Sequence, residues 1–186
     1  SGLNLDQNAI GNLATTFNAT TLASGANGIF DSELRGGILP LDLTFGFSLP
    51  DYAQLKVADI LLQTGQNNIS GTATVPFDGT PLIADIRGDL GDLSSLGAAF
   101  GADIAGAVST NAILGEKEGT QHLALSLEGN NLSPDSGVTV IKNLDVTATS
   151  QGAFNDPQLS MTANLADVSV QDRLIEQARL NVEGGL

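Results

Sequence analysis

Cysteine and tryptophan are absent from the 186 residues, and there is one histidine, His122. Without cysteine the chain has no disulfide, no thiol nucleophile and no thiolate metal site. A single histidine also excludes a metal site built from several imidazoles, and it leaves a Ser-His-Asp triad only one possible base. We therefore expect no catalytic residues, no metal site and no cofactor, and we expect His122 to be an outward-facing strand residue.

Basic residues are scarce as well: 7 Lys and Arg stand against 21 Asp and Glu, which gives a formal net charge of −14. This balance argues against nucleic acid as a partner, because binding a phosphate backbone needs a basic face. Hydrophobic residues make up 41%, too many for a disordered acidic tail. Aromatic residues are only 4%, so a core of this chain would consist mainly of aliphatic side chains.

Long hydrophobic runs are missing too. The longest weakly polar stretch, Leu96 to Val108, is about 13 residues, short of the roughly 20 that a membrane-spanning helix needs. The start, Ser1-Gly2-Leu3, does not resemble a signal peptide. No change of composition marks a linker. We expect residues 1–186 to form a single section of a longer domain.

Apolar and polar residues alternate along the sequence with a period of two. Between Leu39 and Leu49, six apolar residues occupy the odd positions, separated by Pro, Asp, Thr, Gly and Ser. Successive side chains of a strand point to opposite faces, so this run predicts one long strand with a fully apolar face. The apolar residues of this and the similar runs are Leu39, Leu41, Leu43, Phe45, Phe47, Leu49, Leu82, Ala84, Ile86, Leu123, Leu125, Leu127, Leu144, Val146, Ala148, Leu159, Met161, Ala163, Leu165, Ala178, Leu180 and Val182.

These runs predict an all-β protein with an antiparallel sheet that is apolar on one face and polar on the other. Turns are predicted at Asn67-Asn68 and at Asp78-Gly79-Thr80-Pro81, among others. Residues 92–104 break the alternation. Leu93, Leu96, Phe100 and Ile104 have helical spacing, so a short helix capped by Asp92 is expected there.

The apolar face of such a sheet must be covered by something. One possibility is a thin β-sandwich with a closed core. The other is a curled sheet whose apolar concave face stays open to an oily ligand, and Gly46, Gly71 and Gly88 are compatible with strong curvature.

Several short phrases occur in a characteristic order. A strand reaches Ile69-Ser70-Gly71-Thr72, a strand Gly88-Asp89-Leu90 follows, then the insertion Asp92-Leu93-Ser94-Ser95-Leu96, and later Asp156-Pro157-Gln158-Leu159 begins another alternating run. In this order they resemble the degenerate repeats of the TamB and AsmA-like family. The resemblance covers most of the chain and is weakest before Leu39. It rests on patterns, and no catalytic signature contributes to it.

The resemblance implies a long antiparallel sheet bent into a U, a β-taco, with aliphatic side chains lining a hydrophobic groove. It also implies a place and a role. The family is anchored in the inner membrane of diderm bacteria, spans the periplasm and is thought to conduct phospholipids toward the outer membrane. TamB belongs to the translocation and assembly module, works in outer-membrane biogenesis and has an outer-membrane barrel partner of the TamA type. We expect that partner, and the membrane anchor, to engage parts outside these residues.

Three functional hypotheses follow. The first is a non-enzymatic groove in which phospholipid acyl chains contact the apolar residues given above. The second is a structural or adhesive β-repeat module with a closed core. The third, an enzyme on a β-scaffold, is disfavoured by one histidine, seven basic residues and few aromatics for sugar stacking. The acidic residues Asp85, Asp89, Asp92 and Asp103 do not have the spacing of a calcium-binding loop, and we expect a solvated surface there.

Overall fold

The computed structural model describes residues 11–36, 39–135, 137–153, 156–171 and 173–185. They form eleven strands and one short helix, α2. The elements are β1 (Asn12–Leu22), β2 (Gly25–Arg35), β3 (Leu41–Pro50), β4 (Gln54–Thr64), β5 (Asn67–Pro76), β6 (Ile83–Leu90), α2 (Leu93–Phe100), β7 (Ala105–Lys117), β8 (Thr120–Ser133), β9 (Thr139–Ala153), β10 (Asp156–Val170) and β11 (Arg173–Gly185).

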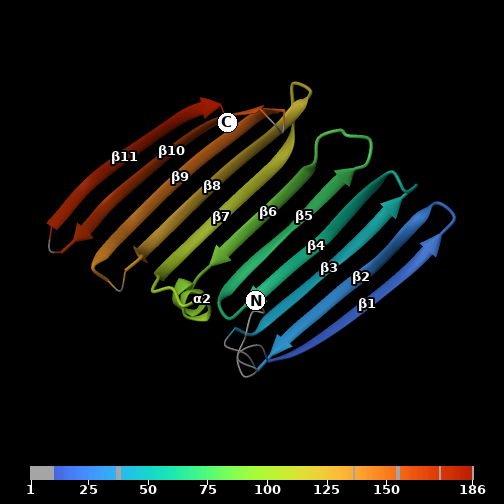
Figure 1. Cartoon of the computed structure of the whole chain (residues 1–186), viewed down its shortest axis with the longest axis horizontal. Helices are drawn as coiled ribbons and strands as arrows, with labels where there is room; N and C mark the ends of the chain where they lie inside the picture. Colours follow the sequence, from blue (N-terminus) through green and yellow to red (C-terminus); the bar gives the residue numbers. More distant parts are fainter. Residues whose placement is uncertain (1–10, 37–38, 136, 154–155, 172, 186) are drawn as a thin grey trace, which may run out of the picture.

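All eleven strands belong to one sheet, and their order in the sheet is their order in the chain. Each strand pairs with its sequence neighbours in the antiparallel sense, so the sheet is a meander, with β1 at one edge and β11 at the other (Figure 1). The sheet is open, because the described part of β1 does not pair with β11. The predicted all-β, antiparallel fold class is therefore confirmed.

The strands are long because their alternation is seldom interrupted, and β9 and β10 reach 15 residues each. Two register shifts occur where the backbone accommodates an extra residue. One lies between Val57 and Ile60 of β4, where Asp59 has a left-handed backbone with φ 52°, and another lies between Asn130 and Ser133 of β8, opposite Ala105 and Ala107 of β7, where Asn131 has φ 49°. Such bulges bend a strand and increase its twist.

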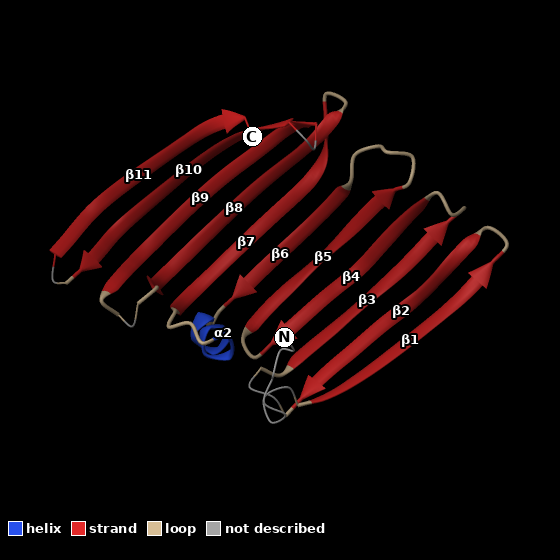
Figure 2. Cartoon of the chain, viewed as in Figure 1, coloured by secondary structure: helices blue, strands red, loops and turns tan. Residues whose placement is uncertain are grey.

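The helix α2 confirms the predicted break in the alternation, but it is shorter than the expected 92–104 and leaves Ile104 outside the helix. Asp92 is its N-cap, with a carboxylate that accepts hydrogen bonds from the amides of Ser94 and Ser95. Gly101, with φ 68°, ends the helix in the left-handed conformation that glycine tolerates best. Figure 2 shows α2 at one end of the strands, beside the connection from β6 to β7.

Two sequence expectations need correction at strand ends. The predicted turn at Asn67-Asn68 is wrong: the turn lies at Gly65 and Gln66, and Asn67 is the first residue of β5. Leu39 and Leu82 lie just before β3 and β6, so neither belongs to its strand as defined by backbone pairing. Pro40 has no amide hydrogen to donate to a ladder, which is consistent with β3 beginning one residue later.

A close contact across β2 depends on glycine. The ring of Phe47 lies over Gly28, and a Cβ atom at Gly28 would come within 2.6 Å of the ring. This position lets Phe47 of β3 reach across β2 and stack on Phe17 of β1, with ring centroids 5.5 Å apart. A glycine in the middle strand therefore allows two non-adjacent strands to make an aromatic contact.

We expect Gly28→Val to destabilise the fold by about 1–3 kcal/mol, because the new side chain would meet the Asn18 carbonyl oxygen and force the Phe47 ring from its stack on Phe17. Urea unfolding measures this loss. Gly115→Val is the matched control, because a Cβ atom at Gly115 of β7 has no neighbour within 4 Å. An equal loss of stability in both variants would contradict the packing role of Gly28.

Candidate functional site: an uncovered apolar face

The pairing registers determine which side chains share a face. Residues directly opposite each other in an antiparallel pair point to the same side of the sheet. We call the side that carries Phe45 the apolar face and the side that carries Thr44 the polar face. Following the pairs from strand to strand places the predicted apolar positions of β3, β6, β8, β9, β10 and β11 on the apolar face.

The apolar face is organised in rows that run across the strands. One row contains, in order from β3 to β11, Leu43, Leu62, Ile69, Gly88, Thr110, Leu127, Val146, Ala163 and Leu180. Neighbouring strands lie about 4.8 Å apart, so this row is roughly 38 Å long. Its side chains are aliphatic except at Gly88 and Thr110. The row therefore offers an apolar path perpendicular to the strands that is interrupted at Gly88 and Thr110.

Aromatic rings gather at the β1 end of the same face. Phe30 and Phe45 stack with centroids 5.0 Å apart, next to the Phe17–Phe47 pair. Toward β11 the corresponding positions carry smaller residues, such as Ala148 and Ala163. The apolar face is therefore bulky and aromatic at one end and mainly aliphatic at the other.

The described residues place no second layer over this face. The sheet is single, and α2 packs at one end of it, against β7 and, through Asn67, against β5. Among the residues whose burial is described, only Ala84, Ala163 and Val168 form a buried apolar core, and most predicted lining side chains are half-buried. The chain exposes 11,855 Å² of surface, whereas a compact protein of 19.0 kDa exposes about 8,400 Å².

Part of the apolar face was not predicted from the sequence. The missed positions on β1, β2, β4, β5 and β7 include Phe17, Phe30, Leu34, Leu55, Val57, Ile60, Leu62, Ile69, Val108, Ala112 and Leu114. In β4 the bulge at Asp59 shifts the alternation, so that Val57 and Ile60 share a face although their spacing is odd. The stretch Ile60-Leu61-Leu62 also puts an apolar Leu61 on the polar face, which hides the pattern.

The helix α2 lies at one end of the apolar face. Asn67 belongs to the apolar face, because it pairs with Leu90, which continues the alternation of Ile86 in β6. Its side chain is almost fully buried, at 2% exposure, and makes three hydrogen bonds. Its amide nitrogen donates to the carbonyl oxygen of Asp92 (2.9 Å) and to Ser95 Oγ (3.2 Å), and its Oδ1 accepts from the Asp92 amide (3.0 Å). Asn67 thus fixes the first turn of α2 to the sheet.

The helix itself is only partly packed. Gly97 is its one buried residue and lies against Ile104, whereas Phe100 is 80% exposed. The Ser94 hydroxyl bonded to the Asp92 carboxylate, helped by the amides of Ser94 and Ser95, lowers the pKa of Asp92 below its usual value. The N-cap is therefore a charged carboxylate at neutral pH, which suits a helix N-terminus.

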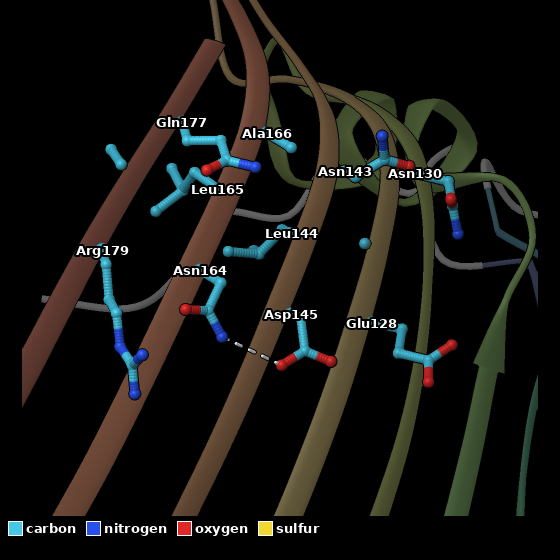
Figure 3. A pocket seen from close by; sticks show the side chains of 12 residues that line it. Glu128, Asn130, Asn143, Leu144, Asp145, Asn164, Leu165, Ala166, Gln177 and Arg179 are labelled. Atoms are coloured by element: carbon cyan, nitrogen blue, oxygen red, sulfur yellow. Dashed lines mark hydrogen bonds between the residues drawn. The ribbon is translucent and has the colours of Figure 1, made fainter. Parts of the chain in front are cut away.

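The polar face carries Asn, Thr, Ser and charged residues, and it has hollows of its own. One of them, of about 630 Å³, crosses β8 to β11 (Figure 3). Its lining residues are the polar Glu128, Asn130, Asn143, Asp145, Asn164, Gln177 and Arg179, together with Gly129, Leu144, Leu165, Ala166 and Ala178. Asn164 Nδ2 donates to Asp145 Oδ1 at 3.5 Å, near the limit for a hydrogen bond. His122 lies on this face, opposite Gln151 of β9.

The acidic residues singled out in the sequence are dispersed. Asp85 pairs with Arg87 at 3.2 Å on the exposed polar face, Asp89 is exposed on the same face, Asp92 caps α2, and Asp103 is exposed between α2 and β7. Within the described residues, no three His, Cys, Asp or Glu side chains are close enough together to hold a metal ion.

Among the described residues, no helix combines the length and hydropathy required to cross a bilayer. Comparison with known proteins adds no assignment: no family model, no curated protein and no solved structure matches this chain.

Proposed function

We propose that this chain conducts phospholipids, with their acyl chains lying against the apolar face. The observation that carries the proposal is the combination of apolar rows with the lack of a second layer over them in the described residues. The proposed setting is the periplasm of a diderm bacterium, between inner and outer membranes, in support of outer-membrane biogenesis. An outer-membrane barrel partner of the TamA type belongs to the same proposal.

Lipid tails need such a surface because water is a poor solvent for them. Each methylene group exposed to water costs about 0.8 kcal/mol, so a two-tailed lipid crossing an aqueous compartment unaided faces a cost of tens of kcal/mol. The row through Leu43, Leu127 and Leu180 replaces water with aliphatic contacts over most of the width of the sheet.

The geometry also favours movement over tight binding. Successive positions of a row repeat about every 4.8 Å, so a tail that slides by one strand finds a similar environment. Dispersion contacts between alkyl groups are weak individually and non-directional. A surface without hydrogen-bonding groups for the tail therefore holds it loosely at every step.

The proposal is tested by photocrosslinking in cells that produce the protein and are labelled with radioactive phosphate. A photoreactive amino acid replaces Phe45 on the apolar face or Thr44 on the polar face, and the pair Leu127 and Ser126 repeats the test on β8. We expect phospholipid label at Phe45 and Leu127, with little label at Thr44 and Ser126.

Two outcomes would contradict the proposal. Equal label on both faces would mean non-specific contact with lipid. Protein crosslinks without lipid at Phe45 and Leu127 would mean that another chain covers the apolar face, which is the structural-module alternative.

A further inference from the structure

Four adjacent strands each contain a three-residue step that interrupts the alternation. The steps run from Gly129 to Leu132 in β8, from Ile141 to Leu144 in β9, from Leu165 to Val168 in β10 and from Ile175 to Ala178 in β11. Strict alternation places the two ends of a three-residue step on opposite faces of a sheet. It would therefore put Leu132, Ile141, Val168 and Ile175 on the polar face.

The structure places Leu132 on the other side. Asn131 inside the β8 step has φ 49°, and Asp167 inside the β10 step has φ 52°, both outside the range of a regular strand. Gly129 lies on the apolar face, because it is opposite Leu144. A Cβ atom at Gly129 would come within 2.6 Å of Leu132 Cδ1. The Leu132 side chain therefore folds over Gly129 on the apolar face.

The pairing carries this assignment across the next three strands. The opposite pairs are Leu132–Ile141, Ile141–Val168 and Val168–Ile175. Because opposite residues share a side of the sheet, all four belong to the apolar face, and we call them the end row. Val168 is 7% exposed, and Leu132 and Ile141 are half-buried. The end row thus widens the apolar face across β8 to β11.

We propose that the end row is a second seat for acyl chains, parallel to the row through Leu127. This inference rests on the proposed function of the apolar face. The end row is entirely aliphatic and crosses three strand spacings, roughly 14 Å. Ile141 precedes Val146 of the Leu127 row by five residues, roughly 16 Å of strand. Acyl chains can therefore lie side by side on the two rows, which suits a lipid with more than one tail.

The helix α2 bounds this second seat toward β5. Asn67 of β5 lies at the same end of the apolar face, and its side chain is 2% exposed and bonded to Asp92 and Ser95 in the first turn of α2. This end of β5 is therefore covered by the helix. The row through Leu127 passes the helix and continues to Leu43 of β3.

The test uses single cysteines, because the chain has none of its own. Purified Ile141→Cys and Lys142→Cys each carry a fluorescent label, and stearic acid with a nitroxide spin label is added to quench nearby fluorophores. We expect several-fold stronger quenching at Ile141 than at the exposed Lys142. Leu127→Cys and Ser126→Cys provide the same comparison on the first row. Far-UV circular dichroism confirms that each variant keeps its strands.

A second pair repeats the comparison where a label does not disturb packing. Ile175 is 48% exposed and its neighbour Glu176 is exposed as well. We expect quenching at Ile175→Cys and little at Glu176→Cys. Strict alternation makes the opposite prediction, with quenching at Lys142 and Glu176 instead.

The substitution Ile141→Asp tests the energetics of the seat. We expect it to weaken quenching by the fatty acid at Ile175 about tenfold or more in ligand concentration, because the carboxylate must lose water against an alkyl chain. Asn143→Asp is the matched control, since it adds the same charge at an exposed position outside the end row. Its binding curve should match that of the unchanged chain.

The outcomes separate this inference from the proposed function. Quenching at Leu127 together with equal quenching at Ile141 and Lys142, or with the pattern of strict alternation, would overturn the second seat and leave the proposed function in place. Equal effects of Ile141→Asp and Asn143→Asp would also overturn the second seat. Absence of quenching at every labelled position would contradict the proposed function, and the second seat with it.

Discussion

Replacing Leu127 with aspartate is expected to weaken acyl-chain binding about thirtyfold or more. Leu127 is half-buried in β8, in the row between Thr110 and Val146. A carboxylate at this position must lose water when an alkyl chain lies against it, at a cost of roughly 2 kcal/mol or more. That cost corresponds to about thirtyfold in affinity. Titration with a fluorescent fatty acid measures the effect.

Ser126→Asp is the matched control for this variant, because it adds the same charge one residue away on the polar face. We expect it to leave fatty-acid binding almost unchanged. Both variants should keep their thermal stability, because Leu127 is only partly covered and Ser126 is exposed. Unchanged binding in Leu127→Asp would mean that acyl chains do not contact this row.

Replacing Asn67 with alanine is expected to destabilise the fold by about 2–3 kcal/mol. The variant removes three hydrogen bonds and leaves the Asp92 amide without its side-chain partner, whereas the Asp92 carbonyl keeps its bond from Ser95 Oγ. Urea unfolding measures the loss, and hydrogen exchange at the Ser94 and Ser95 amides measures the release of α2. The neighbouring Asn68→Ala is the control, since Asn68 Oδ1 is buried without a hydrogen-bond partner among the described residues. A similar loss in both variants would show that Asn67 has no special role.

The stability that Asp92, the N-cap of α2, contributes should depend on pH. The pKa of Asp92 is lower in the folded chain than in the unfolded chain, mainly because the Ser94 hydroxyl donates to its carboxylate. Its contribution to stability is therefore fully present above the unfolded pKa and is lost as pH falls through the folded pKa. The protection of the Ser94 and Ser95 amides against exchange, after correction for the pH dependence of intrinsic exchange, should fall in acid. Asp92→Asn, which keeps a capping oxygen without titration, should show a weaker pH dependence.

Much of the apolar face was predictable because a two-residue period is a geometric property of any strand. Phe45 and Leu127 lie far apart in the sequence, yet each could be assigned to the same side from its neighbours alone. The extent of the sheet toward β1 was harder to predict from the sequence. The β1 and β2 strands contain polar residues such as Thr15 and Ser32 on their apolar side, so their alternation is weak.

The attachment of α2 could not be read from the sequence. An Asn-Asn pair after a glycine resembles a turn, since asparagine tolerates turn conformations well. The turn forms two residues earlier, at Gly65 and Gln66, and this leaves Asn67 in a strand. Its three hydrogen bonds join it to residues more than twenty positions later, and local propensity contains no information about such contacts.

The meander order has a consequence for how such a protein changes in evolution. Each strand pairs only with its neighbours in sequence, so a hairpin can be inserted or deleted without rethreading the chain or altering distant contacts. Every added hairpin lengthens the sheet by about 10 Å and extends both faces equally. The length of the sheet across its strands is therefore set by the number of hairpins, so duplication of a hairpin alone can lengthen it.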